Sequence, residues 1–223
     1  MPIADKADLD PVSSTCFIYP HEERFEMRLY QHAIVKQALQ RSTLVSLPTG
    51  TGKTLIAATV VYNFLRWFPD RICIFMATTR CLVQQQLRAC CRIVGLSPDE
   101  DAQLMTGEES PIARKAKWMT SAARLIFCTP QVLRNDLRSG VCDARRIICI
   151  VFDEAHHATS SRTPYARVAR LVREARAECR VLALSATAGA TVCQASAVPW
   201  HCSVEDICST IPPSHHPPCQ LTS

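Results

Sequence analysis

A candidate phosphate-binding loop is the strongest chemical signal in the sequence. Residues 47–54 are Leu-Pro-Thr-Gly-Thr-Gly-Lys-Thr and lie between a β-like apolar run and a helix-like one. Gly50 and Gly52 allow the backbone to turn its N–H groups toward an anion, and the following helix points its positive end at the same place. Lys53 would then contact the β- and γ-phosphates of ATP, and the Thr54 hydroxyl would bind Mg²⁺. The predicted nucleotide-binding residues of this loop are Thr49, Gly50, Thr51, Gly52, Lys53 and Thr54.

The loop departs from the general phosphate-loop pattern at one position. That pattern, G-x-x-x-x-G-K-S/T, begins with glycine where this chain has Leu47. The alternative interpretation is a strand-to-helix turn in which Lys53 and Thr54 occur by chance. A second motif is needed to decide between the two.

A pair of carboxylates supplies that second motif. Residues 147–152 are Ile-Ile-Cys-Ile-Val-Phe, and Asp153 and Glu154 follow them directly. Open α/β sheets bind ligands at the carboxyl ends of their strands, so both side chains would lie beside the phosphate loop. Asp153 would hold Mg²⁺, and Glu154 would orient or deprotonate the attacking water. Alone, the pair could be charges at a helix N-terminus, but together the two motifs favour a nucleotide site.

The pattern of apolar runs predicts the fold that positions these motifs. Short buried-strand runs alternate with helical patterns, which is typical of a parallel sheet covered on both faces. We therefore expect an α/β fold with a doubly wound, mainly parallel sheet. The predicted strands are 43–47, 72–77, 124–128, 147–152 and 180–184, and the clearest amphipathic helices span 83–94 and 168–175.

Composition excludes several classes of protein. The 223 residues are 48% hydrophobic and 20% charged, which is typical of a globular chain. The 13 cysteines form no C-x-x-C pair and are scattered through apolar runs, so we expect reduced core residues. The N-terminus has no signal-peptide pattern, and no apolar stretch is long enough to span a bilayer. We expect a soluble intracellular protein.

The character of the chain changes after Gly189. Residues 188–223 hold no Lys or Arg and two acids, so residues 1–187 carry 25 basic against 18 acidic residues, or +7. Prolines, cysteines and histidines cluster beyond Gly189 without periodicity, and we expect a largely disordered tail. A metal site is conceivable there, although its spacing matches no standard pattern; its ligands would be Cys202, Cys208, His215, His216 and Cys219.

A stripe of arginines marks the last predicted helix. Arg167, Arg170, Arg173 and Arg176 lie away from its apolar positions. A solvated helix face is the simpler interpretation, and a surface for nucleic acid or a protein partner is the alternative.

Taken together, the motifs resemble those of superfamily-2 helicases and translocases with a DEAH box. The resemblance implies a RecA-like ATP-binding domain, adds His156 to the catalytic group and assigns Gln31 to adenine recognition. It implies contacts with the phosphates of one nucleic-acid strand by Thr79, Arg80, Thr106, Gly107, Thr129 and Pro130. Ser185 and Thr187 match the motif that couples hydrolysis to movement. Two departures are Thr78 and Cys81, which stand where the family has prolines.

Several connecting segments resemble, more narrowly, the Fanconi anaemia group M translocase with its archaeal and fungal relatives. These segments include residues 17–20, 62–69 and 182–187. The resemblance implies ATP-driven remodelling of branched DNA in nuclear repair, with sequence-independent backbone contacts and possible repair-complex partners.

The resemblance also predicts the domain organisation. We expect an N-terminal segment at 1–27, a single RecA-like domain at 28–188 and a tail at 189–223. Enzymes of this superfamily complete their site with arginines from a second RecA-like domain, and residues 190–223 contain no arginine. The alternative to an active helicase is therefore a truncated fragment or isoform that binds nucleotide or DNA but turns over little. A third alternative is a protein-interaction module that uses the helix around Arg170.

Overall fold

A seven-stranded sheet forms the centre of the protein. The computed structural model describes residues 17–20, 28–120, 122–158, 162–186 and 194–197. The strand order is β3-β4-β2-β5-β6-β1-β7; the first six strands are parallel and β7 pairs antiparallel with β1. The strands are β1 (Thr43–Ser46), β2 (Ile72–Met76), β3 (Ala102–Met105), β4 (Leu125–Cys128), β5 (Ile147–Phe152), β6 (Arg180–Ser185) and β7 (Gln194–Ala197).

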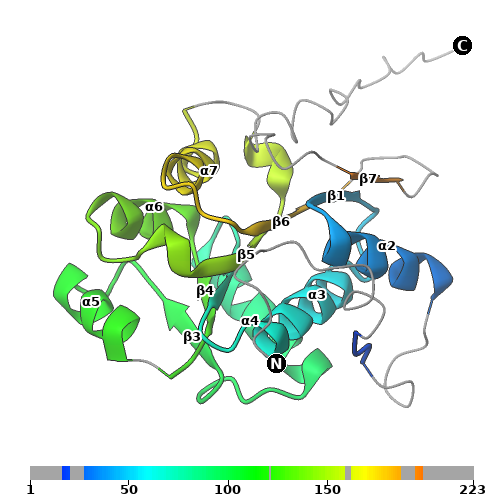
Figure 1. Ribbon diagram of the computed structural model, residues 1–223, viewed down its shortest axis with the longest axis horizontal. Helices are drawn as coiled ribbons and strands as arrows, with labels where there is room; N and C mark the ends of the chain where they lie inside the picture. The colour runs from blue at the N-terminus through cyan, green and yellow to red at the C-terminus, as the bar shows by residue number, and fades with distance from the viewer. Residues whose placement is uncertain (1–16, 21–27, 121, 159–161, 187–193, 198–223) are drawn as a thin grey trace, which may run out of the picture.

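Helices cover both faces of this sheet. One layer comprises α2 (Leu29–Gln40), α3 (Lys53–Trp67) and α4 (Arg80–Val94). The other comprises α5 (Pro111–Thr120), α6 (Pro130–Arg138) and α7 (Pro164–Glu174), together with the 3-10 turns η1 (Ala144–Arg146) and η2 (Ala155–Ala158). Figure 1 shows the two layers on either side of the sheet. Right-handed crossovers place the helices on two faces, because the chain first runs across the sheet from β1 to the edge strand β3 and then runs back toward β6.

The strand interiors explain why the sheet is covered twice. All six residues of β5 and all five of β2 are buried, so both faces of the central strands need apolar cover. Of the described cysteines, all are free thiols and all but Cys81 are buried. Burial raises the pKa of the Cys142 and Cys179 thiols to about 12, which keeps them protonated at neutral pH. The expectation of reduced core cysteines is confirmed for the described residues.

The predicted fold class is confirmed, and each of the five predicted strands exists within one or two residues of its predicted bounds. The sequence analysis missed β3 and β7. Both are four-residue edge strands, and neither has a continuous apolar run that would reveal it. β7 lies inside the tail at 189–223 that we expected to be largely disordered. The other residues of this tail, among them the candidate metal ligands, lie outside the described residues.

Residues 17–20 pack against the layer formed by α2 and α3. The Ile18 N–H donates to Asn63 Oδ1 at 2.8 Å, and Asn63 Nδ2 donates back to the Ile18 carbonyl at 2.8 Å. Phe17 and Tyr19 lie against the His32 ring. Asn63 is fully buried in α3, so this pair of hydrogen bonds holds the segment on the domain.

Within the described residues, no helix is both long and apolar enough to span a membrane.

Candidate nucleotide and nucleic-acid site

The carboxyl ends of the parallel strands bring the predicted motifs to one edge of the sheet. β1 leads into the phosphate loop, and β5 leads into Asp153. The Leu47 N–H donates to the Ser185 carbonyl at 3.2 Å, which joins the start of the loop to the end of β6. Ser185 is buried, and Thr187 lies outside the described residues. The sheet therefore places the loop, the acidic pair and the first residue of the predicted coupling motif side by side.

The phosphate loop has the backbone conformation that its glycines predict. Gly50 and Gly52 adopt φ values of 81° and 90°, in the left-handed region. Gly52 caps the N-terminus of α3, and neither a capping side chain nor an acidic residue occupies the first turn of that helix. The N–H groups and the positive end of the helix dipole are thus left for an anion. These features fit a nucleotide phosphate.

Lys53 points back over its own loop. Its Nζ donates to the Leu47 carbonyl at 2.8 Å and to the Pro48 carbonyl at 3.2 Å. Partial burial lowers the pKa of Lys53, while Glu154 and Asp153 act in the opposite direction. The ammonium is therefore held by weak carbonyl partners beside both carboxylates. A phosphate would offer it a stronger, charged acceptor.

Gln86, which was not predicted as a site residue, links the two predicted magnesium ligands. Thr54 Oγ1 donates to Gln86 Oε1 at 3.0 Å, and Gln86 Nε2 donates to Asp153 Oδ2 at 3.0 Å. One amide thus spans the hydroxyl and the carboxylate, which places two hard oxygen donors together as Mg²⁺ requires. Gln86 lies three residues after buried Val83 on α4, and that helical spacing could have identified it.

The acidic pair occupies a strained turn at the end of β5. Glu154 has φ 52°, which is unusual for a residue with a side chain. The backbone is fixed there by Tyr165, whose hydroxyl donates to the Asp153 carbonyl at 2.7 Å. The Asp153 carboxylate accepts from the Glu154 N–H at 3.1 Å and is 6% exposed. His156 Nδ1 lies 3.3 Å from Glu154 Oε2, so the structure brings three of the predicted catalytic side chains together.

Burial makes Asp153 sensitive to pH. Loss of hydration, followed by the neighbouring Glu154 charge, raises the pKa of Asp153 to about 6. Burial, followed by His157, lowers the pKa of His156, and Glu154 opposes that shift. The site therefore favours a proton or a cation on Asp153 and a neutral His156.

Asp153→Asn should stabilise the metal-free protein above pH 6. Because the folded-state pKa of Asp153 lies above its unfolded value, wild-type stability falls as pH rises from about 4 to about 6. The asparagine variant lacks this loss, so its advantage should approach about 2–3 kcal/mol at pH 7 and vanish below pH 4. Urea unfolding in EDTA at several pH values measures it. A gain that is independent of pH would contradict the ionisation argument.

The predicted adenine residue Gln31 lies against the phosphate loop. Gln31 Nε2 and the Tyr30 hydroxyl both donate to the Thr51 carbonyl, at 2.8 and 2.7 Å. A pocket opens beside them, between the start of α2 and α4, and its lining includes Arg28, Gln31, Thr54 and Arg92. Gln31 itself is buried, so its amide is fixed in place before any base arrives.

Gly52→Ala should weaken nucleotide binding far more than Gly50→Ala. A Cβ at Gly52 would clash with Gln31 Nε2 and displace it from Thr51, whereas a Cβ at Gly50 meets nothing within 4 Å. Both substitutions add the strain of a positive φ, on the order of 1–2 kcal/mol, and only Gly52→Ala adds the clash. Fluorescent-ATP titration should show at least tenfold weaker binding for Gly52→Ala than for Gly50→Ala. Equal losses would show that Gln31 moves away without consequence.

The predicted nucleic-acid residues line the same edge but differ in exposure. Arg80 is exposed and forms a bidentate ion pair with Glu108, directly after Gly107. Thr79 uses its hydroxyl to cap α4, accepting from the Leu82 N–H at 3.3 Å. Thr129 is half-buried at the start of α6, whereas Thr106 and Pro130 are buried. Thr79, Arg80 and Gly107 are therefore exposed, and Thr129 is partly accessible.

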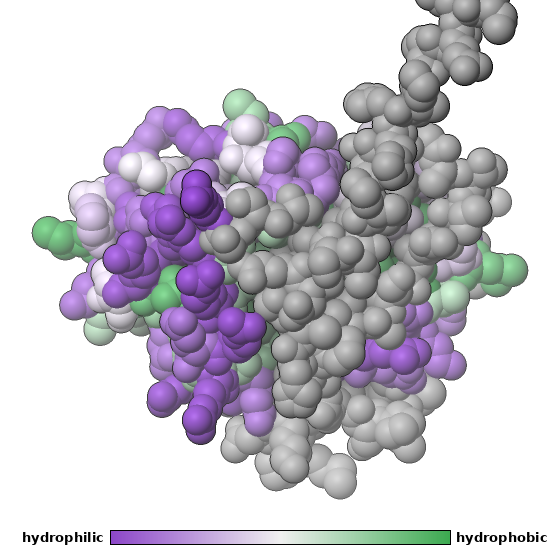
Figure 2. Space-filling view, turned by 90° about the horizontal axis from the view of Figure 1, so that it is seen from above, coloured by the Kyte–Doolittle hydropathy of each residue, from purple (hydrophilic) through white to green (hydrophobic). Residues whose placement is uncertain are grey.

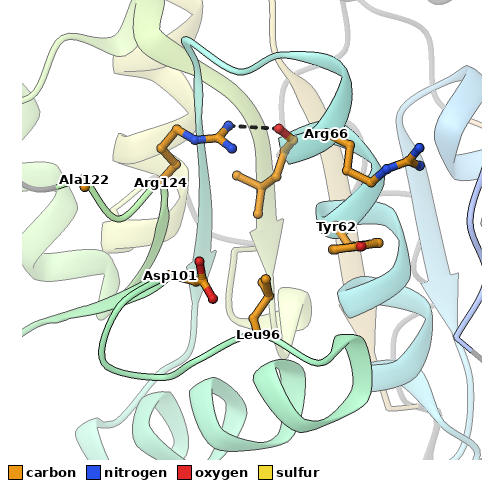
Figure 3. A pocket seen from close by; sticks show the side chains of 7 residues that line it. Tyr62, Arg66, Leu96, Asp101, Ala122 and Arg124 are labelled. Atoms are coloured by element: carbon orange, nitrogen blue, oxygen red, sulfur yellow. Dashed lines mark hydrogen bonds between the residues drawn. The ribbon is translucent and has the colours of Figure 1, made fainter.

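A second pocket lies near the amino ends of the strands, at the edge of the sheet opposite the phosphate loop (Figure 3). Arg124 on its wall donates to the carbonyls of Leu65 and Phe68 at 2.9 and 3.2 Å. These carbonyls belong to the end of α3, so Arg124 satisfies acceptors that the helix leaves unpaired. The pocket is explained by this cap and lies away from the nucleotide loop.

The predicted arginines are all exposed. Arg167, Arg170 and Arg173 lie on α7, whereas Arg176 follows the end of this helix and has a φ of 52°. Most of the coloured surface seen from above is hydrophilic, with few hydrophobic residues (Figure 2). The stripe is consistent with a solvated face.

Comparison with known proteins agrees with this geometry. The DEAD/DEAH box helicase family model matches residues 28–195, three quarters of the chain. The chain belongs to this family. The match includes the phosphate loop, the acidic pair and every strand of the described sheet except the last two residues of β7.

Helicases from fungi, plants and archaea are similar to this family member. A Pyricularia oryzae protein named ATP-dependent DNA helicase MPH1 is 46% identical over 184 residues, covering 82% of this chain and 16% of that protein. An Arabidopsis thaliana protein named DEAD-box ATP-dependent RNA helicase FANCM is 45% identical over 181 residues, covering 81% and 13%. The Hef helicase domain of Pyrococcus furiosus has a TM-score of 0.68 and 32% identity, covering 78% of this chain and 36% of that one.

The chain is much shorter than these helicases. It spans 13–22% of the length of the first eight curated relatives. The DNA-bound helicase MrfA has a TM-score of 0.62 at 17% identity and supports the fold alone.

Proposed function

We propose that this helicase-family chain is the ATP-binding domain of a DNA translocase that acts on branched DNA during repair in the nucleus. The observation that carries the proposal is the bridge through Gln86, which joins Thr54 of the phosphate loop to Asp153 of the acidic pair. This bridge supports a nucleotide site beside the loops that end β2, β3 and β4.

The nucleotide half of the proposal assigns a task to each side chain. Lys53 and the N–H groups of the loop would bind the phosphates, and Gln31 would hold the adenine. Thr54 and Asp153 would hold Mg²⁺, which neutralises phosphate charge when bound. Glu154, oriented by His156, would accept the proton of the attacking water.

The nucleic-acid half rests on charge and exposure. Arg80, the Thr129 hydroxyl and the Gly107 N–H offer donors along one edge, and the folded part of the chain is basic. Donors of this kind bind phosphates without reading sequence, so binding should weaken with salt. The relatives' names include both DNA and RNA helicases, and DNA is favoured here because most of the similar proteins are named DNA helicases.

ATP hydrolysis by the purified 223-residue chain tests the proposal. We expect turnover that forked DNA stimulates more than linear DNA or RNA of equal length, with Lys53→Ala as the inactive reference. Stimulation by RNA alone would contradict the DNA assignment.

The same measurement tests the alternative that the chain is a truncated fragment without the arginines of a second RecA-like domain. Nucleotide binding without turnover above the Lys53→Ala reference, with or without DNA, would favour a nucleotide- and DNA-binding fragment. Adding back a second RecA-like domain from a relative should then restore turnover, because its arginines would stabilise the transferring phosphoryl group.

A further inference from the structure

Helix α5 is held on the domain by two side chains, one charged and one aromatic, rather than by a long apolar stripe. Among its described side chains, at 111–119, only Arg114 and Trp118 are buried, one helical turn apart. Its apolar residues Ile112 and Met119 are 82% and 72% exposed. α5 therefore depends on what Arg114 and Trp118 bind.

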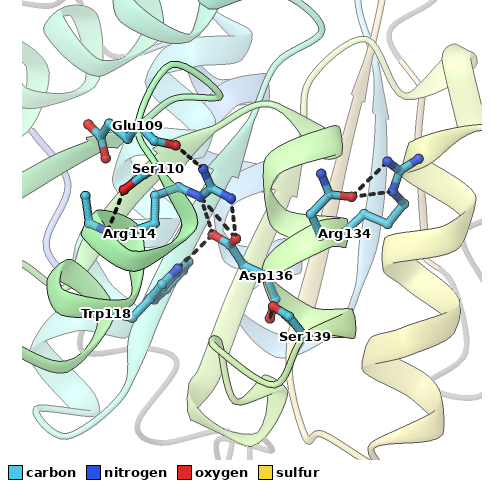
Figure 4. Close-up of polar contacts among 9 residues, drawn as sticks. Glu109, Ser110, Arg114, Trp118, Arg134, Asp136 and Ser139 are labelled. Atoms are coloured by element: carbon cyan, nitrogen blue, oxygen red, sulfur yellow. Dashed lines mark hydrogen bonds and ion pairs between the residues drawn. The ribbon is translucent and has the colours of Figure 1, made fainter.

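Both side chains bind one carboxylate on α6 (Figure 4). Arg114 Nε lies 3.1 Å from each oxygen of Asp136, and Nη2 lies 3.0 Å from Oδ1. Trp118 Nε1 donates to Asp136 Oδ2 at 3.0 Å. The side chains of Arg114 and Asp136 are 7% and 2% exposed, so this cluster is shielded from solvent and from screening by salt.

The cluster also reaches the loop that precedes α5. Arg114 Nη1 donates to the Glu109 carbonyl, and Lys117 pairs with the Glu109 carboxylate at 2.5 Å. Gly107 lies against the first turn of α6, where a Cβ would meet Val132 at 4.0 Å. The cluster therefore ties the Thr106–Gly107 loop to α6, whose N-cap is Thr129.

These two loops are the ones proposed to hold neighbouring phosphates of one strand. Because β3 is the edge strand, nothing beyond it in the described sheet fixes its loop from the outer side. Apolar contacts have little directional preference, whereas hydrogen bonds from an arginine to a carboxylate fix both the distance and the relative orientation of the two helices. A buried ion pair is weak evidence for stability but suits a role in fixing geometry.

We infer that Arg114, Trp118 and Asp136 are positioning residues that set the spacing of the Thr106–Gly107 and Thr129–Pro130 loops for binding one DNA strand. The inference rests on the proposed function. It predicts that loosening the cluster weakens DNA binding while the nucleotide site, at β1 and β5, keeps its affinity.

Asp136→Asn and Trp118→Phe in the full chain test the inference. Trp118→Phe keeps the ring and removes only the donor to Asp136. We expect DNA affinity to fall about tenfold for Asp136→Asn and severalfold for Trp118→Phe. The slope of affinity against salt should fall by about one, and ATP-analogue affinity should stay within twofold.

Asn63→Ala is the matched control. It removes a buried amide on the other face of the sheet, where it holds Ile18, and should lower the melting temperature without changing DNA affinity. DNA and nucleotide affinity falling in parallel, or DNA affinity unchanged, would overturn the inference. If Asp136→Asn does not fold, Trp118→Phe decides by the same criteria.

Failure of the proposed function has a different signature. Thr129→Val alters a proposed DNA contact outside the cluster. If the wild-type chain binds no DNA, or Thr129→Val leaves binding unchanged, the DNA assignment of the loops fails and the inference fails with it. If Thr129→Val weakens binding and Asp136→Asn does not, the inference alone is wrong.

Discussion

Lys53→Ala should reduce ATP turnover by about 10²–10³-fold and also weaken ATP binding. The Lys53 ammonium lies at the phosphate loop, where it donates hydrogen bonds to the carbonyls of Leu47 and Pro48. The substitution removes the positive charge of Lys53 from the phosphates both in the ATP-bound state and in the transition state. Single-turnover hydrolysis and fluorescent-nucleotide titration measure the two losses.

Lys36→Ala is the control for charge. Lys36 is exposed on α2, away from the loop, so its loss changes net charge equally and should change neither quantity. Lys53→Arg should stay impaired, because the planar guanidinium does not reproduce the compact ammonium. Turnover retained in Lys53→Ala would disprove the assignment of this loop.

Glu154→Gln should lower turnover by about 10²–10⁴-fold while ATP binding is retained. Glutamine has the shape of glutamate but cannot accept the proton of the attacking water. The Glu154 charge also helps to raise the pKa of Asp153, so its loss should bring that pKa down and favour the ionised Asp153. Nucleotide binding with Mg²⁺ should therefore be unchanged or tighter.

Glu174→Gln, at an exposed position on α7, is the matched control and should behave as wild type. The contrast with Lys53 is the informative part of the measurement. Lys53→Ala should lose affinity and turnover, whereas Glu154→Gln should lose turnover alone. If Glu154→Gln lost both equally, Glu154 would serve binding rather than proton transfer.

Local sequence determined the parts of the site that depend on backbone chemistry. The run 47–54 specifies a strand, two left-handed glycines and a helix N-terminus, and each of these needs only its near neighbours. The run 147–154 specifies a buried strand with acids at its carboxyl end, because six successive apolar residues fit a doubly covered sheet. The fold class followed from the alternation of strand and helix patterns, and the family resemblance followed from these two runs together with the other motifs.

Tertiary structure decided which side chains from different helices and strands contact one another. Gln86 is one of three successive glutamines, and its spacing from Val83 favours an inward-facing side chain. Only the packing of α4 against the sheet shows that it bridges Thr54 and Asp153. Arg114 and Asp136 are separated by 22 residues and look like ordinary surface charges, yet they are paired and buried. The left-handed Glu154 was equally invisible, because its conformation is imposed by surrounding contacts such as that of Tyr165.

The missed edge strands have the same cause. β3 and β7 are stabilised by hydrogen bonds to neighbouring strands and have no strong local preference for strand structure. Their composition therefore did not predict them. The sequence by itself thus determined the chemistry available and the sheet that carries it. The distances between side chains from different elements were decided only when the chain packed, because a pairing energy depends on a partner that is remote in sequence.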